Sequence, residues 1–344
     1  MWDDDTPARS WRRPPDPPVN PALLESSAEL IAIQAEQRAH YDRIRVLPNR
    51  SAGLLGPFAA GLADRERAIE DALRREAREA VKLQGGPGRT RPVVLHIPHA
   101  SQYIPYPVRR GILLSDAQLE RELVRLTDHL VDELLHVHGA TRVIGHHSRL
   151  VVDPERFEDD ALEPMARVGQ GAVYTRATDG RQIRRLTPAR RRQLIDRYFT
   201  PYHDHLTRMV DEVLERDGRC LIIDGHSFAT KPLPSEADQR PDRPDICIGT
   251  DPFHTPPALV DALRTAFEAE RFRVAVDTPF AGTMVPQRHY RSDARVRSVM
   301  VEVRRGLYCR ESTGRESPHF HGAWMRIHRA VEAALAAWGE APLG

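Results

Sequence analysis

The sequence lacks the features that mark membrane-spanning, exported and disulfide-rich proteins. None of its apolar runs reaches the ~18 residues that a membrane-spanning helix requires. Its N-terminal Met-Trp-Asp-Asp-Asp has neither the basic nor the apolar region of an export signal. Three cysteines among 344 residues, Cys220, Cys247 and Cys309, are too few for a disulfide framework and favour a reducing compartment. We therefore expect a cytoplasmic protein without a membrane partner.

The charge balance excludes a second group of functions. The 50 Lys and Arg residues are matched by 49 Asp and Glu residues, so the formal net charge is +1 at pH 7. A chain without a strong positive field is not expected to bind nucleic acid, and its partner is expected to be a small molecule. The sequence also lacks the HExxH and CxxC patterns of common zinc sites, so a metal site would need residues from distant segments.

Composition divides the chain into three parts. Residues 1–20 are rich in proline and charge, which predicts a disordered arm. Residues 21–88 show helical spacing of Ala, Leu and Ile on either side of a short break, which predicts a helical extension. The glycines at 85–88 mark a boundary, and residues 89–344 are expected to form the main, catalytic domain.

In the main domain, short apolar runs alternate with helical patterns. The expected strands span residues 93–97, 141–144, 149–153, 221–224, 273–276 and 299–303, and the expected helices span residues 115–138, 188–217, 256–270 and 319–338. This alternation is typical of an α/β fold with a mostly parallel or mixed central sheet and helices on both faces. The hydrophobic content of 40% is sufficient for a large core.

Two of the expected strands lead into histidines. The run 93–97 contains His96 and is followed by His99, and the run 221–224 is followed by His226. Ligands of open α/β sheets bind at the carboxyl ends of the strands, because the loops leaving those ends form a crevice. We therefore expect one shared site. His96 itself is expected to pack in its strand or to support a neighbouring ligand.

A divalent metal is one interpretation of this pattern. His99, His226 and Asp128 supply two imidazoles and one carboxylate, which leave the fourth position of a tetrahedral zinc ion open for water. Asp128 lies off the main apolar stripe of the expected helix 115–138 and could therefore face a partly buried cleft. With 16 histidines in the chain, two strand-end histidines can also arise by chance and donate to nearby carbonyl groups. The spacing alone leaves both interpretations open.

Several arginines are suited to recognition of an anion. Arg149 and Arg156 flank an apolar run, and a guanidinium group binds a carboxylate through two parallel hydrogen bonds. Either arginine could equally form a salt bridge with Asp153 or Asp159. Arg288 follows a glycine-containing loop and could hold a second carboxylate. The substrate is therefore expected to be a small anion.

Glu302 is a carboxylate within an otherwise apolar strand pattern. A buried charge is costly unless it is paired, so Glu302 is expected to meet an arginine or a metal site. Burial would raise its pKa, which would suit a general base.

These segments together resemble the N-formylglutamate amidohydrolase family, which is related to zinc carboxypeptidases and succinylglutamate desuccinylase. The resemblance covers roughly residues 92–308, and its specificity comes from the order of its motifs rather than from any single one. The matching stretches are Ile97–Ala100, Thr127–Asp128 with Asp132, Ser148–Asp153 with Arg156, Gly171–Thr175, Pro201–His203, Asp224–Ser227, Asp245–Thr250, Arg288–Tyr290, and Glu302 with Tyr308.

The resemblance implies a zinc-carboxypeptidase-like fold and a hydrolase that releases formate and an amino acid, with N-formylglutamate as the candidate substrate. One divalent metal, expected to be zinc, would bind to His99, Asp128 and His226. Glu302 would activate the attacking water and later protonate the leaving amine. The residues implied for substrate binding are Arg149, Arg156, Arg288, Ser227 and Thr250.

The chain departs from the family pattern in the implied pocket. The family often has Asp-Leu-Asn-Arg where this chain has Asp153-Pro-Glu-Arg156, a second glycine at Thr283, and a histidine at Leu130. These changes concern the pocket walls more than the implied chemistry. Another N-acyl amino acid or a small peptide is therefore an alternative substrate. A binding module that has lost activity is the alternative from another functional class.

Overall fold

The computed structural model describes residues 91–339, which lie within one compact unit, Val81–Gly344. The arm expected at residues 1–20 and the helical extension expected at 21–88 lie outside the described residues. No helix within residues 91–339 is both long and apolar enough to cross a membrane.

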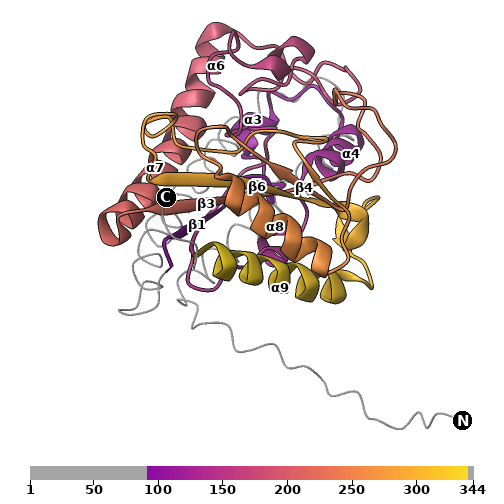
Figure 1. Ribbon diagram of the computed structural model, residues 1–344. Helices are drawn as coiled ribbons and strands as arrows, with labels where there is room; N and C mark the ends of the chain where they lie inside the picture. The colour runs from indigo at the N-terminus through magenta and orange to yellow at the C-terminus, as the bar shows by residue number, and fades with distance from the viewer. Residues whose placement is uncertain (1–90, 340–344) are drawn as a thin grey trace, which may run out of the picture. The chain divides into compact units, whose positions relative to one another are not determined.

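A six-stranded mixed sheet forms the centre of the unit (Figure 1). Its strands are β1 (Val93–Ile97), β2 (Thr141–Ile144), β3 (Cys220–Phe228), β4 (Ile246–Gly249), β5 (Val274–Val276) and β6 (Val296–Arg304). In the order β2-β1-β3-β6-β4-β5, the first four strands are parallel, and β4 pairs with β6 in the antiparallel direction. Two short strands, β7 (Cys309–Arg310) and β8 (Arg315–Glu316), form a separate ribbon.

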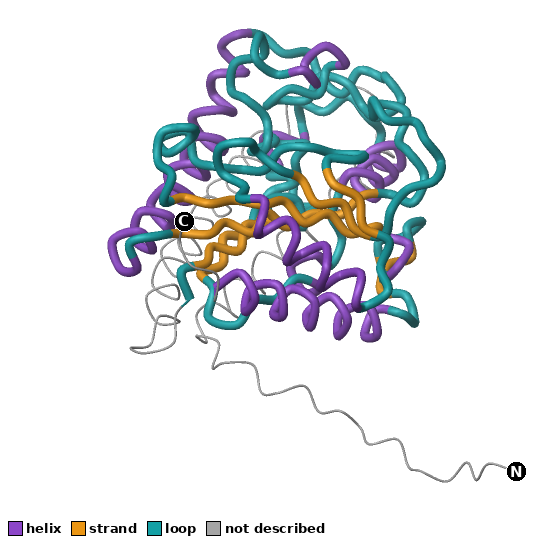
Figure 2. The backbone as a smooth tube through the Cα atoms, viewed as in Figure 1, coloured by secondary structure: helices purple, strands orange, loops and turns teal. Residues whose placement is uncertain are grey.

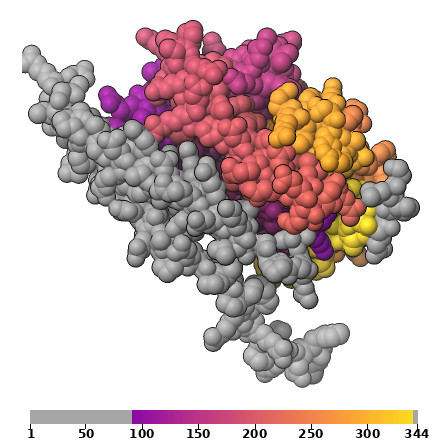
Figure 3. All heavy atoms as spheres, turned by 90° about the vertical axis from the view of Figure 1, so that its left-hand side faces the viewer, coloured from indigo at the N-terminus to yellow at the C-terminus, as the bar shows by residue number. Residues whose placement is uncertain are grey.

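Helices cover both faces of the sheet, which confirms the expected α/β architecture. On one face, α5 (Val131–Leu134), α8 (Pro257–Ala269) and α9 (Phe320–Gly339) share a core with the strands. On the other face, α7 (Thr200–Asp217) packs on β1, β3 and β6, and it contributes to the outer surface on that side (Figure 3). Long loops gather above the sheet, opposite α8 and α9 (Figure 2).

Shorter helices and turns lie among these loops. They comprise α3 (Tyr106–Arg109), α4 (Asp116–Leu126), a 3₁₀ turn at Pro164–Val168, α6 (Pro188–Leu194) and a 3₁₀ turn at Arg305–Leu307. The helix expected at 188–217 is present, but it runs as α6, a π-helical turn at Ile195–Phe199, and α7.

Alternation along the strands separates the core from the polar residues. Leu95, Leu221 and Ile223 belong to the core under α8 and α9, whereas Val94 and Ile222 face α7. Because side chains alternate between faces, the polar residues two positions further along β1 and β3 also lie on the α7 face. That face therefore changes from apolar to polar toward the carboxyl ends of the strands.

The prediction of a single helix at residues 115–138 is wrong. Ser115 caps α4 as expected, but the helix ends at Leu126, and the chain turns through Leu130, which adopts a positive φ of 62°. In this turn the Asp128 N–H donates to the His99 carbonyl oxygen at 3.0 Å instead of continuing the helix. The break brings the Asp128 carboxylate to the end of β1.

The prediction of a strand at residues 149–153 is also wrong. Leu150, Val151 and Val152 are buried, but in turns that pack beside α4, α6 and the π-helical turn rather than in the sheet. Their apolar run has the composition of a strand, and tertiary packing determines its conformation. The antiparallel strand β4 was not expected.

Candidate metal centre and catalytic site

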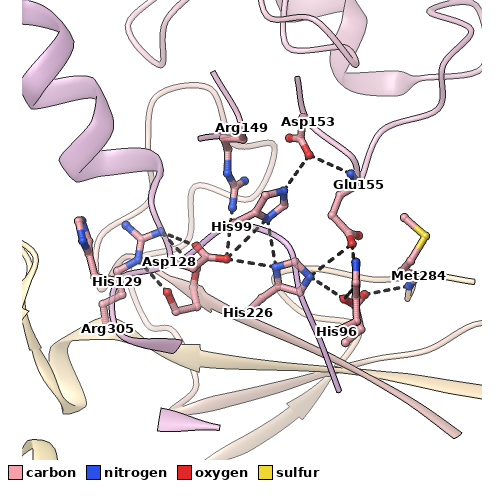
Figure 4. A network of polar contacts seen from close by, with 12 residues as sticks. His96, His99, Asp128, His129, Arg149, Asp153, Glu155, His226, Met284 and Arg305 are labelled. Atoms are coloured by element: carbon pink, nitrogen blue, oxygen red, sulfur yellow. Dashed lines mark hydrogen bonds and ion pairs between the residues drawn. The ribbon is translucent and has the colours of Figure 1, made fainter. Parts of the chain in front are cut away.

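Three ligand atoms converge on one point at the carboxyl end of the sheet (Figure 4). His226 Nδ1 lies 3.1 Å from Asp128 Oδ2 and 3.3 Å from His99 Nδ1, and His99 Nδ1 lies 3.7 Å from Asp128 Oδ2. Ligands bound tetrahedrally at zinc distances are separated by roughly 3.3–3.6 Å. The spacing therefore fits a shared divalent ion.

The hydrogen bonds of the two imidazole rings are also compatible with a shared metal ion. His99 Nε2 donates to Asp153 Oδ1 at 2.8 Å, and His226 Nε2 donates to Asp224 Oδ1 at 2.9 Å. A neutral imidazole that donates from Nε2 has a free lone pair on Nδ1. When both rings are neutral, two lone pairs and a carboxylate oxygen face one another, an arrangement that a cation satisfies. Burial by itself lowers the pKa of His226, but Asp224 and Asp128 hold this pKa well above its usual value, so positive charge is favoured at this point. Carboxylates that orient metal-binding histidines in this way are common in metal sites.

Sheet register explains how residues distant in sequence meet. In the parallel pairing, His96 is the partner of Asp224 and His226 is the partner of Glu302. Paired residues on neighbouring strands point to the same face, and so do residues two apart on one strand. His96, Asp224, His226 and Glu302 therefore project together from the α7 face.

Asp128 is held as a carboxylate by positive charge. Its Oδ2 accepts from Arg149 at 3.2 Å, and its Oδ1 accepts from Arg305 at 3.2 Å. Burial by itself raises the pKa of Asp128, but Arg149 and the two histidines hold this pKa well below its usual range. The Asp128 carboxylate is thus ionised at neutral pH, the state in which a carboxylate can bind a metal.

Glu302 combines burial with an unsatisfied oxygen. Its Oε2 is buried and has no hydrogen-bond partner, and the residue lines the cavity above the site. Burial raises the pKa of Glu302 to about 7, although the charge of His226 opposes this shift. A carboxyl group that exchanges its proton near neutral pH is suited to general acid–base chemistry.

A cavity of about 720 Å³ opens above these groups and is lined by three of the residues expected to bind substrate, Arg149, Arg156 and Ser227. The Nε atoms of Arg149 and Arg156 are buried without hydrogen-bond partners. Apolar side chains line other parts of the wall, among them Phe157, Phe199, Phe228, Phe280 and Met284. The cavity therefore offers both cationic and apolar contacts.

Two of the residues expected to bind substrate lie apart from this cavity. Arg288 is largely exposed and forms an ion pair with Asp211 of α7 at 2.8 Å. Thr250 hydrogen-bonds through its hydroxyl group to Asp277 at 2.7 Å. Neither residue lines the cavity described above. For Arg156 the salt-bridge interpretation also holds, since its Nε lies 3.6 Å from Asp153 Oδ2. Arg149 instead forms an ion pair with Asp128.

Sequence reasoning did not assign a role in the site to three residues that contact it. Asp153 was considered only as a salt-bridge partner, whereas it forms a hydrogen bond with His99. Arg305 reaches both Asp128 and the Ser227 hydroxyl group. Glu155 was noted only as a departure from the family pattern, and it lies 3.3 Å from His96 Nδ1. The pair of arginines that follows the expected strand 299–303, Arg304 and Arg305, is the signal that could have pointed to Arg305.

The paired histidines, the buried carboxylates and the arginine-lined cavity at the strand ends define an α/β protein of the hydrolase type. The chain belongs to the N-formylglutamate amidohydrolase family, because the model of that family matches residues 91–309. Members of this family are hydrolases of linear amides.

Two individual proteins that are similar to this chain have names consistent with this family. The chain is 26% identical to an N-formylglutamate deformylase of Pseudomonas putida over 262 residues, which cover 72% of this chain and 93% of the relative. Its identity to a Pseudomonas aeruginosa protein of the same name is 26% over 257 residues, or 69% of this chain and 92% of the relative.

Solved structures are similar in fold. The crystal structure of N-formylglutamate amidohydrolase from Ralstonia eutropha JMP134 superimposes with a TM-score of 0.64 at 24% identity. The superimposed region covers 74% of this chain and 97% of the Ralstonia chain. The Agrobacterium tumefaciens gene product Atu2144 gives a TM-score of 0.53 at 20% identity, covering 75% and 94% of the two chains.

Proposed function

We propose that this protein is a zinc-dependent amidohydrolase that cleaves an N-formyl amino acid, with N-formylglutamate as the candidate substrate. The observation that supports the proposal most directly is the convergence of two imidazole Nδ1 atoms and one carboxylate oxygen beside Glu302. The names of the Pseudomonas relatives supply the candidate substrate.

His99, Asp128 and His226 are the residues that would hold the metal. Two nitrogens and one oxygen are a ligand set that zinc accepts, and three protein ligands leave a position open, as catalytic zinc sites do. A bound divalent ion would polarise the amide carbonyl, and it would lower the pKa of a metal-bound water molecule to a value near neutrality. Asp153 and Asp224 would hold both rings in the tautomer that leaves Nδ1 available to the ion.

Glu302 is the proposed general base and acid. As a carboxylate, it takes a proton from the attacking water through its unpaired Oε2. As a carboxylic acid, it returns that proton to the amine nitrogen when the C–N bond breaks. A pKa of about 7 allows both directions of transfer at neutral pH, since neither protonation state is strongly favoured.

Arg156 is proposed to bind the α-carboxylate of the substrate. The residue lines the cavity, its side chain is partly exposed, and its Nε is buried without a hydrogen-bond partner. Arg149 and Ser227 line the same cavity and would orient the acyl group. Arg288 and Thr250 are not included in the proposed pocket because of their positions described above.

The size of the cavity favours a second candidate substrate. A volume of about 720 Å³ lies within the roughly 300–1,000 Å³ that accommodates drug-sized ligands, which are larger than N-formylglutamate. Phe157, Phe199 and Met284 would contact an apolar side chain better than a second carboxylate. An N-acyl amino acid with a larger apolar group is therefore the alternative.

Formate release from N-formylglutamate, measured together with the zinc content of the purified protein, tests the proposal. The wild type is compared with His99→Ala and with His319→Ala, a control in which the altered histidine is exposed and does not line the cavity. We expect His99→Ala alone to lose both zinc and turnover. Zinc binding without formate release would reject the substrate, and a wild type that binds no metal would reject the ligand set.

A further inference from the structure

A second cluster of metal-ligand side chains lies beside the first and consists of His96, Glu155 and Asp224. We infer that this cluster binds a second divalent transition-metal ion, so that the site is binuclear. The cluster offers one imidazole nitrogen and two carboxylate oxygens, and the side chains of His96 and Asp224 are fully buried. It shares none of its residues with the first ligand set.

The ligand atoms have the spacing of a coordination shell. His96 Nδ1 lies 2.8 Å from Asp224 Oδ1 and 3.3 Å from Glu155 Oε1. Ligands at roughly 2.0–2.2 Å from an ion are separated by about 2.8–3.6 Å in octahedral or tetrahedral geometry. Glu155 extends from its loop toward His96 and His226 (Figure 4). Three different segments thus direct donor atoms at one point.

Hydrogen bonds within the protein leave the carboxylate oxygens at this point incompletely paired. Asp224 Oδ1 already accepts from His226, and its Oδ2 accepts from the Met284 N–H at 2.8 Å. When His96 Nε2 donates to the Tyr202 oxygen 2.7 Å away, His96 Nδ1 presents a lone pair to two carboxylate oxygens. When Tyr202 is the donor, His96 Nδ1 donates to Asp224, and Glu155 remains without a donor.

Glu155 is the residue that most requires a cation. Its Oε1 is buried and has no hydrogen-bond partner. Within residues 91–339 its ion pairs involve the rings of His96 and His226, at 3.3 and 3.8 Å, and no Arg or Lys side chain. A buried carboxylate oxygen without a donor or a cation is costly. A divalent ion at this point would satisfy Glu155 and Asp224 together.

The proposed ion has a route from solvent. Glu155 and His226 both line the 720 Å³ cavity, whereas His96 and Asp224 are fully buried and do not line it. Three protein ligands leave further positions, which water or an oxygen atom of a bound molecule can take on the cavity side. His226 lies between the two clusters, with Nδ1 in the first and Nε2 bonded to Asp224 of the second.

The test is metal stoichiometry of the full chain, stripped with a chelator and reloaded with Mn²⁺ or Zn²⁺. We expect two ions per chain in the wild type and one in Glu155→Gln, which keeps the side-chain shape but removes the charge. Glu268→Gln, at an exposed position on α8, is the matched control and should keep both ions. His96→Gln is a second variant in case Glu155→Gln folds poorly, as judged by circular dichroism.

Electron paramagnetic resonance of the Mn²⁺-loaded protein gives an independent readout. Two neighbouring ions produce a spin-coupled spectrum, which Glu155→Gln should replace with that of a single ion. One ion per chain in the wild type at saturating metal would overturn the inference, and so would equal stoichiometry in wild type and Glu155→Gln. This outcome is distinguishable from failure of the proposed function, because His99→Ala removes the first ion and Glu155→Gln removes the second.

Discussion

Asp153 is expected to control how tightly His99 binds a metal. Its Oδ1 accepts from His99 Nε2 at 2.8 Å, and its Oδ2 accepts from the Tyr174 hydroxyl group at 2.7 Å. Both Asp153 and His99 are buried, so water cannot replace the lost partner easily. Removing a carboxylate that orients a metal-binding histidine lowers metal affinity by roughly 10- to 100-fold.

Two substitutions separate the charge of Asp153 from its hydrogen bond. Asp153→Asn keeps an oxygen that can accept from His99 but removes the negative charge, so we expect an affinity loss of about 10-fold, or about 1.4 kcal/mol. Asp153→Ala removes the acceptor as well and frees the ring to change tautomer. Its expected loss is about 100-fold, or about 2.7 kcal/mol.

Zinc affinity is measured by competition with a chromophoric chelator at neutral pH. Asp159→Asn is the matched control, because Asp159 is exposed and its carboxylate accepts only from the nearby Ala161 N–H in the described structure. Wild-type zinc affinity in a folded Asp153→Asn protein would refute the ligand set. It would mean that His99 does not bind the ion through Nδ1 while its Nε2 donates to Asp153.

Three further substitutions address the base, the substrate arginine and the support of the site. Glu302→Gln should lower kcat by roughly 10²- to 10⁴-fold while zinc remains bound; in the wild type, kcat/KM should fall about tenfold per pH unit below about 7, because the ionised base is then depleted. Arg156→Lys should raise KM for N-formylglutamate by roughly 10- to 100-fold in steady-state assays, because a lysine cannot form two parallel hydrogen bonds. Gly145→Ala should lower the free energy of unfolding by about 1–3 kcal/mol in urea titrations, because a Cβ there overlaps the carbonyl group of Pro98. Wild-type values in any of these assays would contradict the corresponding role.

Much of the sheet could be predicted because its signals are local. The apolar runs that form β1, β3 and β6 are bounded by polar or turn residues, and their order along the chain matches the observed strands. The run at 149–153 has the same composition, yet it packs beside α6. No local signal distinguishes these two cases. The difference lies in which distant segments pack on each apolar run, and the run itself does not specify them.

The site shows the same division between local and distant information. His99 and His226 follow predicted strands, so their proximity could be expected from the geometry of parallel sheets. Asp128 was expected on a helix, whereas a turn at Leu130 with positive φ brings it to the histidines. Arg288 was expected in the pocket, but its partner Asp211 lies on α7, far away in sequence. Side-chain partners of this kind depend on tertiary contacts that a single sequence does not show.

The alternation of β1, β3 and β6 also bears on how this protein can change. Alternate residues of these strands carry either the α8 and α9 core or the polar groups of the α7 face. Substitutions at His96, Asp224 or Glu302 therefore remove few contacts from the core that holds the sheet together. New ligand sets and substrate preferences can thus be selected on one face while the fold is maintained by the other.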